Sequence, residues 1–519
     1  MATTKFEACR IVEEYEKGIR YNNRIDLYET VKRNENFFIG RQWEGVNAPD
    51  LEKPVNNILK RVVSYFISQI VSDDISVRLT GYSHLSETYP QEVLSYINSE
   101  IDRVIEHTGA KLIGRDSLRD SAVDGDSCLH VYWDADAETG QFALGEIRVE
   151  LIDNTNVLFG NPQKGAVEKQ PYILLPMRVD VKQAQKEAKE HGGEWDSIRA
   201  DRDRTNQPNA AALPEDDLVT VIVRYWRNEQ TGTIFACKCT ADGYWIRKPR
   251  DTELKLYPIA YWTWERVKNS YHGQSPITQL IPNQIIINKL QAMTVKATQD
   301  MSFPKVLYDR TKIDKWTNRI GEAIGVFGDP NLAIARALPG AAASSDAQRL
   351  VEQVMTLTRD TMGASDAALG NVRPDNTSAI IAVQKASSAP LELQKMAFYQ
   401  WIEDYVRIFV DMMRAYYGVR VLTGRDGDAV AVDFSGLNLS QLLLKVNVGA
   451  SAYWSELTQV QTLDNLFRAQ LLDPAIYVES IPDAYIPNKG EILKAMEERA
   501  QAAMPAAEPV PAAEPQIGG

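Results

Sequence analysis

The chain has few residues of the kinds that build metal sites and disulfide frameworks. Its 519 residues include four cysteines and five histidines. Cys237 and Cys239 lie two apart on a predicted strand, so they share one face of it and are poorly placed to bind one metal ion together. The histidines are scattered, and none has the HExxH spacing of a zinc hydrolase. We therefore expect free structural thiols, no metal and no cofactor.

The sequence also lacks the signatures of a membrane or secreted protein. No apolar run reaches the roughly 18 residues that a helix needs to cross a bilayer. The opening segment MATTKFEACRIVEEYEKG is charged and has neither the apolar stretch nor the cleavage site of a signal peptide. We expect a protein that is made and used in a cytoplasm-like, reducing compartment, with no membrane partner.

Net positive charge is missing as well. Lys and Arg number 57 against 70 Asp and Glu, which gives a formal net charge of −13. A protein that holds nucleic acid tightly is usually basic, because each phosphate that it neutralises adds affinity. An acidic chain suits a channel through which DNA must slide, and it equally suits a protein whose charge only keeps it soluble. Charge alone leaves both interpretations open.

No catalytic constellation stands out in the sequence. There is no phosphate-binding GxxxxGK[ST] loop, and the glycines at 424 and 427 are typical of a hairpin turn. His130 alternates with apolar residues on a predicted strand, which favours a structural histidine, although three carboxylates lie nearby in the sequence: Asp124, Asp126 and Asp134. Since no nucleophile elbow accompanies it, a hydrolase site is not expected.

Hydrophobic periodicity predicts an α+β protein. Strands are predicted at 75–80, in a hairpin around Glu138-Thr139-Gly140, in a meander from 218 to 248, at 258–265, and in a hairpin and strand between 419 and 449. Residues 191–217 are polar and indicate a surface loop. Helices are predicted over residues 5–36, 56–72, 91–107, 110–124, 181–191, 276–301, 344–363 and 379–417.

The most informative stretch of the sequence covers residues 273–309. Proline is tolerated in the first turn of a helix, and a residue before proline is pushed out of the helical region. Pro276 therefore begins a predicted helix of roughly 40 Å, and Phe303, which precedes Pro304, ends it. We expect this helix to pack against neighbours while showing some of its amides to water or a ligand: Asn283, Gln284, Asn288, Gln291 and Gln299.

A second informative stretch covers residues 370–413. The loop at 364–378 is longer than the roughly two to eight residues that usually join helices, and long ordered loops often carry function. The helical pattern that follows breaks near Pro390, where a proline causes a kink. Large apolar residues then recur at helical spacing and indicate a core stripe: Trp401, Tyr405, Phe409, Met412 and Met413.

Both stretches resemble tailed-phage portal proteins, in the branch typified by the short-tailed phages. The Gly-x-Ser-Pro opening, the amide-bearing helix and the Pro-Lys-Val-Leu exit are similar to the stem and clip entry of that family. The 370–413 stretch is similar to its channel loop and long kinked helix, and the order of these blocks fits along residues 34–498. The resemblance implies an α+β portal fold with wing, stem, clip and helical crown, whose copies form a closed ring of about twelve through head-to-tail contacts.

The same resemblance divides the chain into regions. They are a wing (1–272), a first stem helix (273–302), a clip (303–343), a second stem helix (344–363), a channel loop (364–378), a kinked helix with further wing strands (379–452), crown helices (453–503) and a disordered tail (504–519). The tail is rich in Ala, Pro and Glu, a composition that cannot bury a core.

Three groups of candidate site residues follow. Lys289 and Lys296 lie near one face of the first stem helix, and two roles are open for them: transient contact with DNA phosphates in a channel, and pairing with acids of a neighbouring subunit. In the channel loop, Asn371, Arg373 and Asn376 are implied to line the narrowest part of the channel.

The third group lies in the clip, which is basic within an acidic chain. Residues 303–340 hold six Lys or Arg against four Asp or Glu, a net charge of +2. They include a small predicted helical segment near 312–319. The predicted docking surface for acidic parts of a packaging motor or tail adaptor consists of Arg310, Lys312, Lys315 and Arg319. An ordinary solvated surface is the alternative.

The resemblance, together with the missing catalytic motifs, implies a portal protein that is not itself an enzyme. It would be located at one capsid vertex of the virion after assembly in the host cytoplasm, and would pass double-stranded DNA inward during packaging and outward during ejection. The implied partners are the terminase large subunit, head–tail adaptor and tail proteins, and the major capsid and scaffolding proteins. The alternative from another class is a cytoplasmic nucleic-acid-processing enzyme with an α+β body.

Overall fold

The computed structural model shows a mixed α+β chain that divides into two compact units. Unit 1 comprises Met1–Val71 and Val77–Asn447, and unit 2 comprises Ser72–Ser76 and Val448–Gly519. The structure describes residues 2–71, 75–81, 91–138, 144–202, 217–303, 305–313, 315–317, 324–332, 335–337, 345–363, 389–423, 429–438, 441–448 and short pieces between 463 and 481. In unit 2, residues 465–468 are helical, and the rings of Phe467 and Tyr477 stack with centroids 4.5 Å apart.

Unit 1 opens with two helices, α1 (Ala2–Arg24) and α2 (Leu27–Ile39). The expectation of one helix over residues 5–36 is therefore wrong. Asp26 has a left-handed backbone (φ 53°), which a helix interior does not accommodate, so it separates the two helices. Gly40, with φ 96°, ends α2 in a conformation that glycine adopts without steric cost.

A three-stranded antiparallel sheet forms one layer, in the order β3 (Leu144–Ile152), β2 (Asp126–Glu138) and β9 (Ile259–Thr263). The predicted hairpin is β2 and β3, in which Cys128 lies opposite Ile152. The helices α3 (Ile58–Val71), α4 (Gln91–His107) and α5 (Ala110–Asp124) precede it, and α5 packs on β2. On this sheet also packs α10 (Glu392–Tyr416), whose predicted core stripe is buried as expected.

A five-stranded antiparallel sheet has the order β4 (Leu158–Phe159), β5 (Ile173–Asp180), β6 (Leu218–Arg227), β7 (Ile234–Thr240) and β8 (Trp245–Asp251). Strands β6 to β8 are the predicted meander. One face packs against α1 and the other against α6 (Val181–Glu190).

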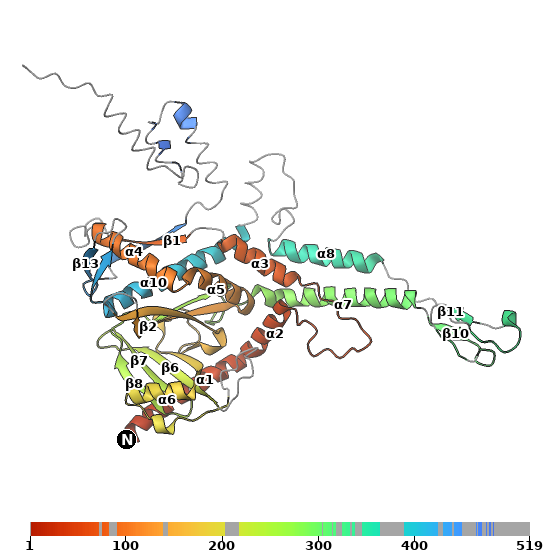
Figure 1. Cartoon of the computed structure of the whole chain (residues 1–519), viewed down its shortest axis with the longest axis horizontal. Coiled ribbons are helices and arrows are strands. Elements are labelled where there is room, and N and C mark those ends of the chain that lie inside the picture. Colours follow the sequence, from red (N-terminus) through yellow and green to blue (C-terminus); the bar gives the residue numbers. More distant parts are fainter. Residues whose placement is uncertain are drawn as a thin grey trace, which may run out of the picture. The chain divides into compact units, whose positions relative to one another are not determined.

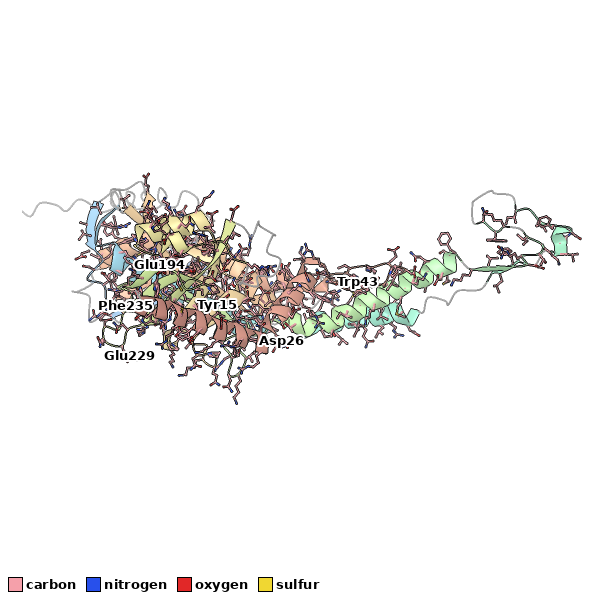
Figure 2. All side chains as sticks on the ribbon, turned by 90° about the horizontal axis from the view of Figure 1, so that it is seen from below. Tyr15, Asp26, Trp43, Glu194, Glu229 and Phe235 are labelled. Carbon is pink, nitrogen blue, oxygen red and sulfur yellow. The ribbon has the colours of Figure 1, made fainter. Side chains whose placement is uncertain are left out.

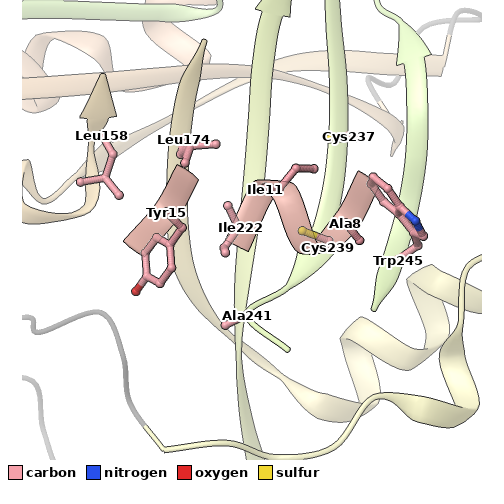
Figure 3. Packing of buried hydrophobic residues seen from close by; sticks show 10 residues of the cluster. All are labelled: Ala8, Ile11, Tyr15, Leu158, Leu174, Ile222, Cys237, Cys239, Ala241 and Trp245. Carbon is pink, nitrogen blue, oxygen red and sulfur yellow. The ribbon is translucent and has the colours of Figure 1, made fainter. Parts of the chain in front are cut away.

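Side chains alternate between the two faces of β7, so three consecutive residues contact different helices. Cys237 and Cys239 share the face towards α1, as predicted, and pack with Ala8 and Ile11 (Figure 3). Lys238, between them, donates from Nζ to Glu187 Oε2 of α6 at 2.8 Å. Burial raises the pKa of the Cys237 thiol to about 12, so this thiol stays protonated and unreactive.

Between β9 and α10 the chain forms two long helices with a small module between them. The helices are α7 (Pro276–Ser302) and α8 (Ser345–Thr361), which match two predicted helices. The module pairs β10 (Val306–Tyr308) with β11 (Ala335–Ala337), and we call its described residues, 305–337, the tip. Figure 1 shows α7 and α8 side by side, with β10 and β11 beyond the end of α7. The helical segment expected near 312–319 is wrong for the residues described there: residues 310–312 form a turn, and 315–317 have no regular structure.

The remaining elements complete unit 1. The hairpin β12 (Val419–Thr423) and β13 (Ala429–Asp433) follows α10, and β14 (Leu442–Val448) pairs with β1 (Ile75–Gly81). The 3₁₀ turns are η2 (Asn154–Asn156), η3 (Val167–Lys169), η4 (Trp195–Ser197), η6 (Pro330–Leu332) and η7 (Ala389–Leu391). The last of these contains Pro390 and leads directly into α10.

Candidate functional site

The first turn of α7 is capped as its Ser-Pro start predicts. Ser275 Oγ accepts a hydrogen bond from the Ile277 N–H at 3.0 Å, and Pro276 occupies the first helical position. The same hydroxyl donates to the Ala122 carbonyl of α5 at 2.7 Å. Ser275 therefore both caps the first turn of α7 and attaches that turn to α5.

A buried ion pair lies directly before this start. His272 Nδ1 is 2.8 Å from Asp126 Oδ2, and the two side chains are only 3% and 0% exposed. Asn154 donates to Asp126 Oδ1 at 2.6 Å, while Tyr261 OH (2.5 Å) and the Gly273 N–H (3.1 Å) donate to Oδ2. The carboxylate thus has partners from β9, the η2 turn and the approach to α7. We call these side chains the root network.

The imidazole ring extends the root network to α1. His272 Nε2 lies 3.3 Å from Asn22 Oδ1, so both ring nitrogens face an oxygen atom. The ring also lies 3.9 Å from the ring of Tyr271, centroid to centroid. No spacing in the sequence indicates this pair, because Asp126 and His272 are 146 residues apart.

His130, the histidine weighed from the sequence, has a different environment. It is buried on β2, and its Nε2 lies 2.9 Å from Tyr225 OH. Desolvation, with a smaller contribution from Lys238, lowers the pKa of His130 to about 4, so the ring is neutral near pH 7. The expectation of a structural histidine is confirmed, and the nearby Asp126 belongs to His272 instead.

The amides of α7 are largely used within the chain itself. Gln284 and Asn288 are buried, with 1% and 3% exposure. Gln284 donates to the Asn56 carbonyl at 2.7 Å and to Asn288 Oδ1 at 2.9 Å, and Asn288 donates to Gln42 Oε1 at 2.6 Å. Asn283 donates to Thr358 of α8 at 3.1 Å. The expectation that amides of this helix face water or a ligand is wrong for Gln284 and Asn288, because buried amides need partners and find them here. It holds for Gln299, which is exposed, whereas Asn283 is half-buried.

The two halves of α7 differ sharply in burial. Every fully buried residue of α7 lies between Pro276 and Ala292. Beyond that point Met293 is 63% exposed and Phe303, just after the helix, is 71% exposed. Figure 2 shows the far part of α7 with side chains extending from it and few other elements beside it. We call residues 293–303 the outer half of α7.

Exposed apolar side chains continue from the outer half into the tip and α8. In the tip only Ile313 is buried among the described residues, so this module has almost no core of its own. A two-stranded sheet of three-residue strands is not stable alone in water. The large exposed apolar residues of this region are Met293, Val295, Met301, Phe303, Leu307, Ile324, Phe327, Leu332, Leu350 and Leu357.

The predicted channel lysines lie on the exposed side of α7. Lys289 is exposed and has no acidic partner among the residues that the structure describes. Lys296 Nζ is 3.2 Å from Asp300 Oδ1, one turn further along the same helix. Exposed pairs of this kind contribute only about 0–1 kcal/mol. The other candidates for the channel, Asn371, Arg373 and Asn376, lie outside the described residues.

Three of the four predicted docking residues lie in the described tip. Arg310 and Lys315 are exposed, and Lys312 donates from Nζ to the Leu332 carbonyl at 2.9 Å. The Phe327 N–H bonds the Lys312 carbonyl at 2.7 Å, so the backbone brings two tip segments together. Arg319 lies outside the described residues.

A group of acids surrounds Arg119 near the end of α5. Arg119 donates to Glu35 Oε1 at 2.6 Å and to Asp120 Oδ1 at 3.0 Å. Burial raises the pKa of Asp124 well above its ordinary value, and the charges of Asp153 and Asp120 add to the rise. Burial likewise raises the pKa values of Asp120 and Asp153. Burial therefore favours the neutral form of the Asp124 carboxyl relative to the same group in water.

Two further observations concern the described part of the chain as a whole. None of its helices is long and apolar enough to cross a membrane. This described part also contains no group of three or more His, Cys, Asp or Glu side chains placed to hold a metal ion. No known protein family and no curated protein matches this sequence. Function is therefore inferred from the geometry of α7, α8 and the tip.

Proposed function

We propose that this chain is a portal subunit of a tailed double-stranded DNA phage. Copies of it form a closed ring at one capsid vertex, and DNA passes through the central channel during packaging and ejection. In this proposal α7 and α8 are the stem, the tip is the clip, and the two sheets with their helices belong to the wing. The proposal assigns no catalytic step to the chain.

The observation that carries the proposal is the apolar surface of the outer half of α7, the tip and α8. Single exposed apolar residues are ordinary, but many of them gathered on one pair of helices and the module between these helices indicate an interaction site. The exposure does not reflect a helix that packs badly along its whole length, because the first half of α7 has buried residues as far as Ala292. Contact with further copies supplies the missing cover, and a head-to-tail contact whose rotation closes produces a ring.

The charge of the chain supports passage of DNA without tight binding. The net charge is −13, and each phosphate contact that a protein makes adds affinity and therefore resistance to sliding. The exposed Lys289 and the paired Lys296 offer few cations along α7. A channel of this composition attracts DNA weakly.

The basic tip is the proposed docking surface for partners. Arg310 and Lys315 are exposed on the same module as the exposed apolar Phe327 and Leu332, a combination suited to an acidic partner with an apolar centre. A terminase motor during packaging and a head–tail adaptor afterwards are the partners that this role requires. Coat and scaffolding proteins would contact the wing.

Electron microscopy of the purified chain tests the proposal. We expect ring-shaped particles with a central hole, formed from one polypeptide species. Particles assembled with coat and scaffolding proteins should hold nuclease-protected DNA only when the chain is included. A compact monomer at micromolar concentration, in the presence of scaffolding protein as well, would contradict the proposal and favour a monomeric enzyme.

A further inference from the structure

An unusually long ordered connection joins α2 to α3. Helix α2 ends at Ile39 and α3 begins at Ile58, whereas helices are usually joined by about two to eight residues. The connection contains no helix or strand, yet the structure describes all of it. Long loops that keep one conformation without secondary structure often serve a function.

Side-chain hydrogen bonds close the two ends of this connection onto each other. Gln42 donates to the Phe37 carbonyl at 2.9 Å, and Asn57 donates to the same carbonyl at 3.3 Å. Trp43 Nε1 donates to the Pro54 carbonyl at 2.9 Å, across the neck of the loop. A compact loop with adjacent ends is an Ω-loop, and we call residues 43–56 the Ω-loop.

The neck of the Ω-loop is attached to the middle of α7. Asn288 donates to Gln42 Oε1 at 2.6 Å on one side of the neck, and Gln284 donates to the Asn56 carbonyl at 2.7 Å on the other. Figure 1 shows the connection extending alongside α7, and Trp43 is labelled in Figure 2. The buried amides of α7 thus hold both ends of the loop at one level of the helix.

The outer part of the Ω-loop is acidic and partly apolar. Glu44, Asp50 and Glu52 are exposed, and no described residue forms an ion pair with them. Lys53, the one base in the loop, donates from Nζ to the Val46 carbonyl at 2.8 Å. Val46 itself is exposed. The loop therefore carries three exposed acids against one base, together with an exposed apolar side chain.

The other side of α7 carries a complementary surface at the same level. At about 100° per residue, Ile286, Lys289, Met293 and Lys296 form one band that is turned away from Gln284 and Asn288. Ile286 and Met293 are exposed, as is Lys289. This outer band combines positive charge with apolar surface, which is the complement of the Ω-loop.

In a ring, rotational symmetry relates the height of the Ω-loop neck in one copy to the height of the outer band in the next copy. Rotation about a ring axis leaves the height of every atom along that axis unchanged. The neck of the Ω-loop is bonded to Asn288, and Lys289 is the next residue, only about 1.5 Å further along the helix. In a ring, the neck of the loop in one copy therefore lies near the level of Lys289 in the next copy, and the rest of the loop extends from there.

We infer that the Ω-loop of one subunit docks on the outer band of α7 in the neighbouring subunit. The acids Asp50 and Glu52 meet Lys289, and Val46 packs with Ile286 and Met293. This contact rests on the proposed ring and specifies one of its interfaces. It gives Lys289 the second of its two possible roles, pairing with acids of a neighbour.

Charge reversal tests the contact. Lys289→Glu should raise the protein concentration at which half of the chain is assembled by about threefold to fivefold, since the loss of an exposed pair costs up to about 1 kcal/mol, which is about fivefold in an equilibrium constant. Adding Asp50→Lys and Glu52→Lys to the same chain should restore assembly to within about twofold of wild type. Lys60→Glu, at an exposed lysine of α3, is the matched control and should leave assembly unchanged.

A cysteine pair supplies a second readout that does not depend on charge. Asp50→Cys combined with Lys289→Cys should give a ladder of disulfide-linked copies on oxidation with diamide, whereas each single variant should give only the background from the exposed Cys9. Normal assembly of Lys289→Glu, or failure of the triple variant to recover, overturns the contact while leaving the ring intact. Absence of any assembly by the wild-type chain overturns the ring itself.

Discussion

The two halves of α7 illustrate how one helix can be fixed by its own chain at one end and left for a partner at the other. From Pro276 to Ala292 one side of the helix packs against α2, α3 and α5, and its amides bond side chains and backbone of other segments. The outer half keeps large apolar side chains in water, among them Met293 and Met301. Helical structure continues unbroken across the boundary, so the difference lies in packing and not in local propensity.

This comparison separates two kinds of stability. Removing a partner from the buried half leaves an unpaired polar group away from water, which costs free energy in the isolated chain. Changing an exposed residue of the outer half costs the isolated chain little, but it removes contact area from any assembly.

The largest effect is expected at the root network. Asp126→Ala removes the partner of His272 and the acceptor for three other donors, so we expect a loss of about 3–5 kcal/mol of unfolding free energy, as for other broken buried pairs. Asp300→Ala breaks the exposed pair with Lys296 and should cost about 0–1 kcal/mol. Denaturant midpoints of the two variants provide the measurement. Similar midpoints would show that the root network does not anchor α7.

A smaller loss of stability is expected when a buried amide side chain of α7 is replaced. Asn288→Leu leaves the buried Gln42 side chain without its donor and should destabilise the chain by about 1–3 kcal/mol. Gln299→Leu, in the exposed outer half, should change stability by about 0.5 kcal/mol or less. Thermal melting compares the two, and equal melting temperatures would refute the description of a supporting amide chain.

The stability of the chain should depend on pH through the buried carboxyl of Asp124. Burial, with the charges of Asp153 and Asp120 adding, raises the pKa of Asp124. A carboxyl whose pKa rises on folding stabilises the folded state below its unfolded pKa of about 4, and this contribution is lost as pH rises through the folded-state pKa. Asp124→Asn stays neutral throughout, so it should melt above wild type at neutral pH, with the gap narrowing towards about pH 4.

The control for this pH effect is Asp116→Asn, at an exposed aspartate on the same helix. Its melting temperature should follow wild type at every pH. A gap for Asp124→Asn that stays constant with pH, or a variant that melts below wild type at neutral pH, would contradict the buried, proton-binding character of Asp124.

The smallest effect on the isolated chain is expected in the outer half. Met293→Ser combined with Phe303→Ser replaces exposed side chains, so the melting temperature of the dissociated chain should change little. Assembly should weaken strongly, because each copy contributes these side chains to the ring. The measurement is mass photometry over a concentration series. Undiminished assembly would place these residues outside the interface.

Much of the fold follows from local pattern in the sequence. Ser275-Pro276 and Phe303-Pro304 mark the ends of α7 because proline restricts the backbone there. Strict alternation places Cys237 and Cys239 on one face of β7, and helical spacing identifies the buried stripe of α10. These features depend on neighbours within a few residues, which is the range that periodicity reports.

The parts that the sequence could not predict depend on distant residues or on a single backbone angle. The break at Asp26 rests on one left-handed residue inside an otherwise helical pattern. The pairing of Asp126 with His272, and of Asn288 with Gln42, joins segments far apart in the chain. An amide on a helix face has the same spacing whether it bonds water or a buried loop, so periodicity alone could not tell the two apart.

Backbone hydrogen exchange across α7 tests the central claim most directly. In the assembled protein, amides in the outer half should exchange as slowly as those of residues 280–292, because neighbouring copies cover the outer half and the chain itself covers the first half. On dilution to the dissociated chain, only the outer half and the tip should lose protection, while the first half keeps it. Equal protection of both halves in the dissociated chain, or an outer half that exchanges fast in the assembly, would contradict the account.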